Sequence, residues 1–142
     1  MKNIYIFLLS FLAFYYSNAQ DWQWQNPKPT GNSLSSAYFT SVDTGYIVGD
    51  CGTILKTING GITWNSLSIE TSVSLISVYF TDSNTGYAVG QNGMIIKTTD
   101  AGLNWTIQES GTTEDLYSVQ FPDADTGYIS GSNSILLKTS NG

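Results

Sequence analysis

The sequence predicts an all-β protein built from tandem copies of one four-stranded antiparallel unit. Three observations support this fold class. The same residues recur at a spacing of 41 positions. Each copy contains short runs of β-branched and aromatic residues separated by polar turns, which is typical of strands. No segment after residue 19 has the periodicity of an amphipathic helix.

The 41-residue repeat is the strongest signal, and it runs from Phe39 to Gly142 without insertion or deletion. Phenylalanines, tyrosines, lysines and tryptophans align in it: Phe39, Phe80 and Phe121; Tyr46, Tyr87 and Tyr128; Lys56, Lys97 and Lys138; Trp64 and Trp105. Four short strands in such a period are the spacing of a β-propeller blade. The sequence therefore predicts a row of propeller blades.

The elements of the second unit illustrate the expected order. Its four strands are expected over residues 75–80, 86–89, 94–98 and 105–108. Asn92-Gly93 predicts a type I′ turn between the second and third strands, because both central residues of that turn need positive φ. Unbroken apolar pairs in the third strands indicate strands that are covered on both faces, as in stacked blades.

Residues 1–19 read as a secretory signal peptide. Lys2 supplies the positive charge, Ile4–Tyr16 is the apolar run, and small residues precede a cleavage site between Ala19 and Gln20. The apolar run is shorter than the roughly 20 residues that cross a bilayer. We therefore expect an exported protein, secreted, periplasmic or at the cell surface, without a stable membrane span after cleavage.

Residues 20–142 are predicted to form a partial β-propeller, an incomplete ring. Its expected parts are a closing strand at about 22–30, blades at about 34–69 and 75–110, and an incomplete blade at about 116–142. These parts are too few for the usual 4–8 blades. We expect an N-terminal fragment of a protein with about seven blades. The alternative is a short protein that completes its ring by oligomerisation.

A repeated turn precedes each tryptophan. In residues 57–64, Asn59 is expected to bond backbone amides two residues on, Gly61 to take positive φ, and Trp64 to pack over the turn. The candidate structural residues of these turns are Thr57, Asn59, Gly61, Trp64, Thr98, Asp100, Gly102, Trp105, Thr139 and Asn141. Asn and Asp exchange at one position, which favours a folding role over acid–base catalysis.

These turns resemble the Asp-box, also called the bacterial neuraminidase (BNR) repeat. Together with the Thr-Gly-Tyr and Lys-Thr positions before them, they are most similar to the repeat of the photosystem II assembly and stability factor family. The resemblance covers about residues 22–142 and implies a secreted or lumenal seven-bladed propeller. Asp-boxes also occur in sialidases, sortilin-type receptors and xyloglucan-degrading endoglucanases. The photosynthetic members use an arginine-rich surface, whereas this chain has no arginine.

The composition excludes several kinds of chemistry. The chain has no histidine and no arginine, and 5 lysines stand against 11 acids for a formal net charge of −6. Histidine bases, histidine-ligated metals and arginine clamps are thereby excluded, and binding to nucleic acid is disfavoured. Cys51 is the single cysteine, so no internal disulfide can form, and we expect it to be a turn residue. We expect no catalytic residue, no cofactor and no metal.

Three recurring sets of residues leave alternatives open. Asp43 and Asp125, or Asp50 at another repeat position, could supply a pair of glycosidase carboxylates. Asp82, Asp123 and Asp125 could bind calcium weakly, and the recurring tyrosines could stack on sugars. Turn capping and core packing are the favoured interpretations of these residues.

The favoured function is that of an exported, non-enzymatic β-propeller module that scaffolds or binds a protein or glycan partner, and not nucleic acid. One alternative is a protein similar to the photosystem II assembly and stability factors. The other is an Asp-box glycoside hydrolase whose catalytic residues lie outside this sequence.

Overall fold

The computed structural model describes residues 22–25, 27–67, 69 and 71–142, so the predicted signal peptide and its cleavage site at Ala19 and Gln20 lie outside the described residues. The described part is all β, as predicted. Its strands are β1 (Leu34–Phe39), β2 (Gly45–Gly49), β3 (Ile54–Thr57), β4 (Asn65–Leu67), β5 (Leu75–Phe80), β6 (Gly86–Gly90), β7 (Ile95–Thr98), β8 (Thr106–Gln108), β9 (Leu116–Gln120), β10 (Gly127–Gly131) and β11 (Leu136–Thr139).

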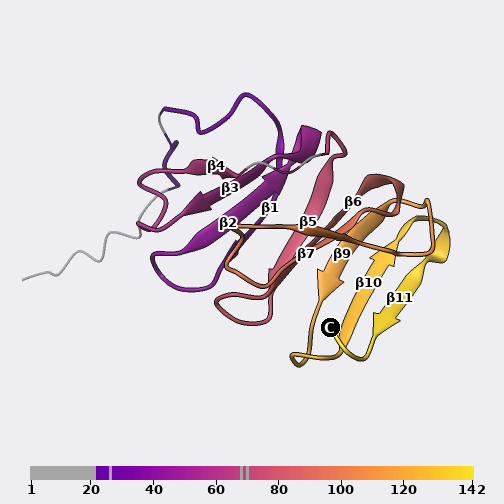
Figure 1. Ribbon diagram of the computed structural model, residues 1–142. Coiled ribbons are helices and arrows are strands. Elements are labelled where there is room, and N and C mark those ends of the chain that lie inside the picture. Colours follow the sequence, from indigo (N-terminus) through magenta and orange to yellow (C-terminus); the bar gives the residue numbers. More distant parts are fainter. Residues whose placement is uncertain (1–21, 26, 68, 70) are drawn as a thin grey trace, which may run out of the picture.

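The strands form three antiparallel sheets in chain order. The first sheet holds β1 to β4, the second β5 to β8 and the third β9 to β11, and within each sheet sequential strands are neighbours. Figure 1 shows the sheets side by side in one row, with the first and the third at its two ends. The described sheets form no closed ring.

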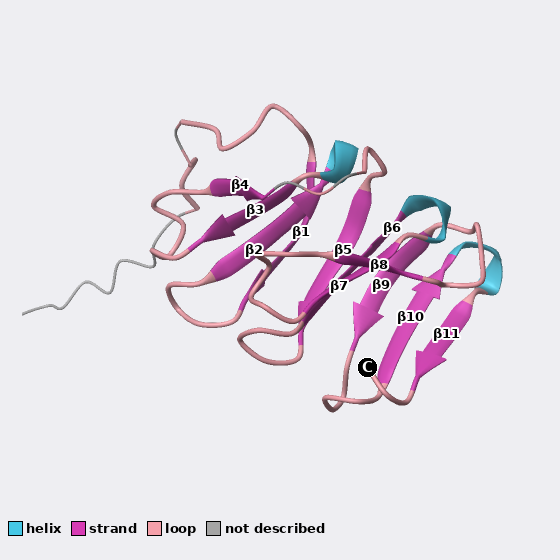
Figure 2. Ribbon diagram, in the orientation of Figure 1, coloured by secondary structure: helices cyan, strands magenta, loops and turns pink. Residues whose placement is uncertain are grey.

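The hairpin between the second and third strands of each sheet closes with the predicted turn. Asn92 and Gly93 have φ of 55° and 69°, and the Met94 amide donates to the Gln91 carbonyl at 3.0 Å. Both central residues therefore have the positive φ of a type I′ turn. The same turn follows β2 and β10, and the three turns are the short helical segments of Figure 2, η1 (Asp50–Gly52), η2 (Gln91–Gly93) and η3 (Ser132–Ser134).

Two hydrophobic cores lie between neighbouring sheets. The first joins Tyr46, Val48 and Ile54 of the first sheet to Leu75, Val78, Phe80, Ala88 and Ile96 of the second. The second joins Tyr87, Val89 and Ile95 to Leu116, Val119 and Phe121. Strand β6 is buried along its whole length, since a sheet covers each of its faces. The prediction from the unbroken apolar runs concerned the third strands. It is confirmed for β3 and β7, where Ile54, Leu55 and Ile96 are buried, whereas Leu136 of β11 is 70% exposed.

Backbone hydrogen bonds also connect the sheets at matching positions. The Gly52 amide donates to the Val73 carbonyl at 3.0 Å, and Gly93 donates to Glu114 at 2.8 Å. Because the same bond recurs one repeat later, the two junctions hold the sheets in the same relative placement.

The segment that precedes β1 forms no strand within its described residues 22–25 and 27–30. The side chains of Trp22 and Trp24 are exposed. A closing strand needs a partner strand, and no strand pairs with this segment among the described residues, so the expected strand at about 22–30 stays a prediction.

Candidate functional site

The predicted turn residues of the first sheet form one compact hydrogen-bond network. Thr57 is fully buried, its hydroxyl donates to Asn59 Oδ1 at 2.9 Å, and its Oγ1 accepts from the Gly61 amide at 2.9 Å. Asn59 Oδ1 also accepts from the Thr63 amide at 2.9 Å. The Trp64 ring lies over Gly61, within van der Waals reach of any Cβ added there.

One detail of this turn differs from the sequence-based expectation. The Asn59 side chain bonds the amide four residues on, at Thr63, and not the amide two residues on. The amide two residues on belongs to Gly61 and is taken by the Thr57 hydroxyl. Positive φ at both Gly60 and Gly61 swings the chain so that Thr63 faces the Asn59 carboxamide.

The second sheet repeats the turn with a carboxylate. Thr98 donates to Asp100 Oδ1 at 2.8 Å, the Gly102 amide donates to Thr98 Oγ1 at 2.9 Å, and the Asn104 amide donates to Asp100 Oδ1 at 2.9 Å. The bonds from the Asn104 backbone and side chain lower the pKa of Asp100 to about 2. Asp100 is therefore held as an anion that accepts hydrogen bonds.

The two tryptophans have matching surroundings. Trp64 meets the Phe39 ring edge-on, with centroids 6.1 Å apart, and Trp105 meets Phe80 at the same 6.1 Å. In the third sheet, Thr139 donates to Asn141 Oδ1 at 3.0 Å and so begins the same network.

The Asp-box turn of one sheet receives side chains from the sheet before it. Tyr46 Oη and Lys56 Nζ both donate to the Ala101 carbonyl, at 2.8 and 2.7 Å. One repeat later, Lys97 Nζ donates to the Gly142 carbonyl at 3.1 Å. Burial, together with the nearby charge of Asp100, raises the pKa of Tyr46. These turns therefore connect neighbouring sheets.

In the first two sheets, the recurring tyrosines are buried in the hydrophobic cores. Tyr46 and Tyr87 are 0% and 5% exposed, so core packing is confirmed for them and stacking on sugars is excluded for these two rings. Tyr128, in the third sheet, is 39% exposed.

The residues at the recurring acid positions accept hydrogen bonds from the backbone amides of the turns. The carbonyls of Asp43, Asn84 and Asp125 accept the amides of Gly60, Ala101 and Gly142, each at 2.9 Å, so the side-chain type is free to vary. Asp82 and Asp123 each accept two amides of their own turn through one carboxylate oxygen. These contacts favour turn capping over a catalytic pair.

The pKa values of these carboxyls also argue against acid catalysis. Backbone amides lower the pKa of Asp82 and Asp123, and the Ser132 and Asn133 side chains lower that of Glu114. A glycosidase general acid needs a raised pKa. Within the described residues, no group of three or more acidic or cysteine side chains is placed to hold a metal ion.

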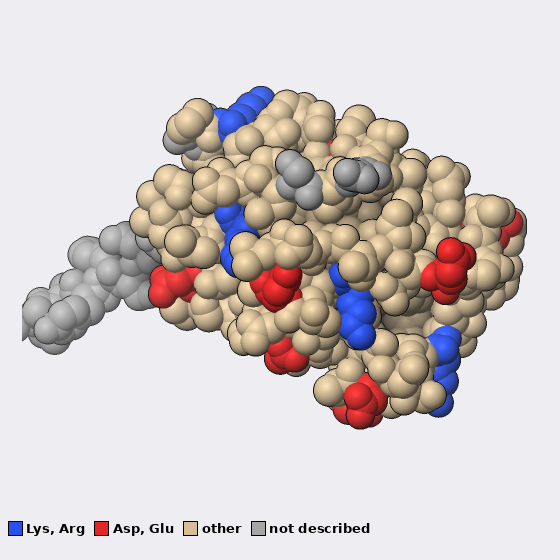
Figure 3. All heavy atoms as spheres, viewed as in Figure 1, with Lys and Arg blue, Asp and Glu red and all other residues tan. Residues whose placement is uncertain are grey.

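Charged groups are scattered over the surface. Figure 3 shows acidic and basic side chains as separate spots on the face that it displays, with uncharged surface between them. Cys51 is exposed and free at a turn. In the part of the chain that the structure describes, no helix has the length and apolar character needed to cross a membrane.

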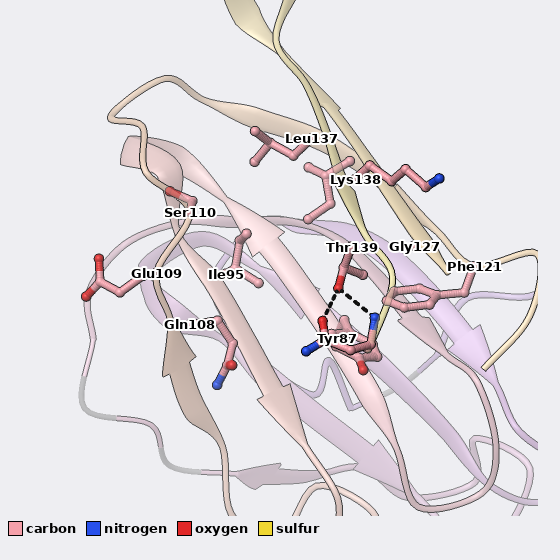
Figure 4. Close-up of a pocket in the computed structure, with 13 residues that line it drawn as sticks. Tyr87, Ile95, Gln108, Glu109, Ser110, Phe121, Gly127, Leu137, Lys138 and Thr139 are labelled. Carbon is pink, nitrogen blue, oxygen red and sulfur yellow. Dashed lines mark hydrogen bonds between the residues drawn. The ribbon is translucent and has the colours of Figure 1, made fainter. Parts of the chain in front are cut away.

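A hollow of about 410 Å³ lies between the second and third sheets (Figure 4). Tyr87, Ile95 and Phe121 supply apolar surface, and Gln108 and Glu109 lie at its polar side. It adjoins β11, which pairs with β10 and has no second neighbouring strand among the described residues.

Sequence reasoning missed a group of exposed aliphatic side chains on the Asp-box turns and the hairpins beside them. We call this group the loop rim, and its members are Val42, Ile58, Ile62 and Leu103, which are 88%, 66%, 81% and 73% exposed. The loops of Val42 and Ile62 are joined by the bond from the Gly60 amide to the Asp43 carbonyl. Ile62 and Leu103 occupy one repeat position, and this recurrence was the available signal.

Comparisons with known proteins agree with this architecture. The model of the family "Photosynthesis system II assembly factor YCF48" matches residues 16–107 and 63–142. No curated protein matches the chain.

Three solved structures share the fold. A structure of YCF48 bound to a D1 peptide is 23% identical with a TM-score of 0.70, and it aligns with 80% of this chain. YCF48 from Cyanidioschyzon merolae is 24% identical with a TM-score of 0.71, over 82% of this chain. An ancestral GH74 enzyme is 19% identical with a TM-score of 0.64, over 78% of this chain. The chain spans 39% of each YCF48 structure and 18% of the GH74 enzyme.

Proposed function

The chain belongs to the photosynthesis system II assembly factor YCF48 family, and from this premise we propose that it is a non-enzymatic β-propeller module that binds a protein partner. The proposal includes export by the signal peptide expected over residues 1–19. Two findings support the binding role. The family is described as an assembly factor, and a solved relative is described as bound to a peptide.

The loop rim is the contact surface that we assign to this function. Burying exposed aliphatic surface against a partner is favourable by roughly 25 cal/mol of free energy for each Å² removed from water. Clusters of exposed apolar residues mark sites of protein interaction. Ile62 and Leu103 keep this exposure in two successive repeats, which is the single observation that carries the proposal.

The surrounding charges indicate the chemistry of the partner. Asp43 follows Val42 directly, and Asp82 lies at the corresponding hairpin of the second sheet. The whole chain carries a formal net charge of −6. A polypeptide segment with apolar side chains flanked by lysine or arginine would satisfy both features, because opposite charges steer partners together and fix their register.

Two observations weigh against a catalytic role for this chain's own acids, whereas the glycoside hydrolase alternative places its catalytic residues outside this sequence. The pKa of Asp100 is lowered by its hydrogen bonds, and those of Asp82, Glu114 and Asp123 are lowered as well. The likeness to the GH74 enzyme, at 19% identity, concerns the fold alone. Release of reducing ends from xyloglucan by the purified chain would contradict the proposal.

A second candidate is a role similar to that of YCF48 itself. The relative bound to a D1 peptide favours it. This sequence has no arginine, whereas the resemblance to the photosynthetic members implies an arginine-rich surface. Titration of the chain with the D1 peptide and with a scrambled D1 peptide separates the candidates. A preference for the native peptide that is lost in Leu103→Asp supports the second candidate.

Photo-crosslinking tests the contact surface directly. Benzoylphenylalanine is introduced at Ile62, or at Ile107 as a control that is also exposed but lies on β8 outside the loop rim. In the cells that produce the protein, position 62 is expected to yield one discrete protein adduct, and position 107 none. Equal adducts from both positions, or none from position 62, would contradict the assignment.

A further inference from the structure

We propose that Asp82 determines which polypeptide segments bind the loop rim, by pairing with a lysine or arginine of the partner. The inference rests on the proposed function, because it concerns the same surface. Asp82 and the loop-rim residue Leu103 both lie on loops of the second sheet. Hydrophobic cores join this sheet to a neighbour on each side, so these side chains are exposed with both neighbours in place.

Leu103 supplies the apolar part of this surface. Its side chain is 73% exposed, although strand β6 of the same sheet is buried along its whole length. Hydrogen bonds fix its loop. The Gly102 amide donates to Thr98 Oγ1 at 2.9 Å, and the Leu103 amide donates to the carbonyl of Asp100 at 3.3 Å. A partner that covers Leu103 therefore meets a loop that is already ordered, which lowers the entropic cost of binding.

The hairpin that carries Asp82 is joined to the loop of Leu103. The start of β6 pairs with the end of β7, so the two loops lie at the same end of the sheet. The Ala101 amide also donates to the Asn84 carbonyl at 2.9 Å and connects the two loops directly. The negative charge of Asp82 and the apolar side chain of Leu103 therefore belong to one hydrogen-bonded surface.

Asp82 is held as an exposed anion. Its Oδ1 accepts the Asn84 amide at 2.6 Å and the Thr85 amide at 2.8 Å. These backbone bonds lower the pKa of Asp82, so the carboxyl is ionised at neutral pH. Both bonds fall on Oδ1, and a carboxylate has a second oxygen with lone pairs of its own. A partner's ammonium or guanidinium can therefore pair with Asp82 while the turn keeps its bonds.

The lysines of the neighbouring strands have different surroundings. Lys56 Nζ donates to the Ala101 carbonyl at 2.7 Å, and Lys56 and Lys97 each lie 5.3 Å from a tyrosine ring centroid. Both lysine side chains are half-buried, whereas Asp82 is exposed. The charge that a partner meets on the hairpin joined to the loop of Leu103 is therefore negative.

A basic segment that also carries an apolar side chain is the partner that fits this surface. Its apolar side chain would cover Leu103, and its lysine or arginine would pair with Asp82, which fixes the register of the segment. A segment with an acidic residue at the same place would meet Asp82 as a like charge and would be rejected.

The first sheet supplies a matched substitution for Asp82. Ser41 stands at the same repeat position. Its hydroxyl oxygen accepts the Asp43 amide at 3.3 Å and the Thr44 amide at 3.0 Å, which are the amides that correspond to those bound by Asp82. Asp82→Ser is therefore expected to remove the charge and keep the turn.

Selection from a random peptide library displayed on phage tests the inference. The full chain is used as wild type, Asp82→Ser and Glu109→Gln. Glu109 is exposed and follows β8 at the opposite end of the second sheet, so Glu109→Gln removes an equal charge elsewhere. Peptides that bind a chain but not its Leu103→Ser version are retained, because these occupy the loop rim. We expect an excess of lysine and arginine in the peptides retained on wild type and on Glu109→Gln, and none on Asp82→Ser.

Fluorescence anisotropy of one retained peptide measures the pair. The peptide is compared with a version in which its lysine or arginine is replaced by glutamine. Asp82→Ser is expected to weaken the original peptide by about two- to fivefold, as for an exposed ion pair, and to leave the glutamine version unchanged. Glu109→Gln is expected to change neither. If Asp82→Ser does not fold by circular dichroism, Asp82→Asn replaces it, because a carboxamide oxygen can accept the same amides.

Two results would overturn this inference alone. One is a set of Leu103-dependent peptides without an excess of lysine or arginine, and the other is an equal loss of affinity for the original and the glutamine peptide in Asp82→Ser. A selection that yields no Leu103-dependent peptide would overturn the proposed contact surface together with the inference. The two failures are therefore distinguishable.

Discussion

Tyr46 of the first sheet lies flat on Phe80 of the second, with ring centroids 4.1 Å apart and ring planes inclined by 22°. Tyr87 and Phe121 repeat the arrangement at 4.3 Å and 23°. Aromatic pairs of this kind contribute about 0.5–1.5 kcal/mol beyond the area that they bury. The stack is therefore a property of the repeat, and it joins each sheet to the next.

Replacing Tyr46 separates its two contributions. Tyr46→Ala removes a fully buried ring and is expected to lower the free energy of unfolding by about 3–5 kcal/mol. Tyr46→Phe keeps the stack and loses one hydrogen bond, so about 1 kcal/mol or less is expected, since Lys56 still donates to the Ala101 carbonyl. Urea denaturation measures both values. The exposed Tyr117→Ala serves as control, within about 0.5 kcal/mol of wild type.

Gly90 admits no side chain, for a reason other than its φ angle. A Cβ at this position would lie 2.1 Å from the carbonyl oxygen of Ser74, which belongs to the backbone. Gly90→Ala is therefore expected to cost about 1–3 kcal/mol through forced backbone displacement. Gly31→Ala is the matched control, because nothing lies within 4 Å of a Cβ there. Equal melting temperatures for the two variants would contradict the steric account.

The Asp100 turn predicts a specific pH dependence. Its folded pKa is lowered to about 2 from an ordinary 3.8, so its contribution to stability is complete above pH 3.8 and is lost as the pH falls through about 2. Asp100→Asn, which copies Asn59, is expected to remove this acid-sensitive part while keeping most of the stability at neutral pH. Urea midpoints at pH 7, 3 and 2 test this. A wild-type and an Asn variant that lose stability in parallel would contradict it.

Cys51 occupies a left-handed position in its type I′ turn, at φ 54°. Asn92 and Asn133 hold the same position in the other sheets. Cys51→Asn is expected to match or exceed the wild-type melting temperature, because Asn tolerates this region well. Cys51→Val is expected to lose about 1–2 kcal/mol through its β-branched side chain. A Val variant as stable as the Asn variant would refute this turn assignment.

Most of the fold could be predicted from the sequence, because the same pattern of strands and turns recurs in three successive units. The type I′ turn followed from Asn92-Gly93, whose φ preference is local. The bond from Thr63 to Asn59 did not follow, since two successive residues with positive φ redirect the chain in a way that residue types alone do not define.

The candidate site was harder to predict than the fold. Tyr46 and Tyr128 share a repeat position, yet one is buried and the other exposed, because burial depends on whether another sheet follows. The loop rim was not predicted, because Ile62 and Leu103 lie inside a turn motif that is defined by its polar residues and glycines and not by its aliphatic residues. An aliphatic residue at the same turn position in two repeats, where a solvent-exposed polar residue is expected, was the sequence signal for this surface.

The shared Ala101 carbonyl has a consequence for the order in which the chain acquires its structure. Its two donors precede it by 55 and 45 residues, so these two bonds of the first sheet can form only after the turn of the second sheet has been synthesised. Assembly can then advance vectorially, each newly made turn locking the unit behind it. Each further repeat would add contacts to its neighbour only, so no loop to be closed would become longer. The conformational entropy lost in each step would therefore stay constant.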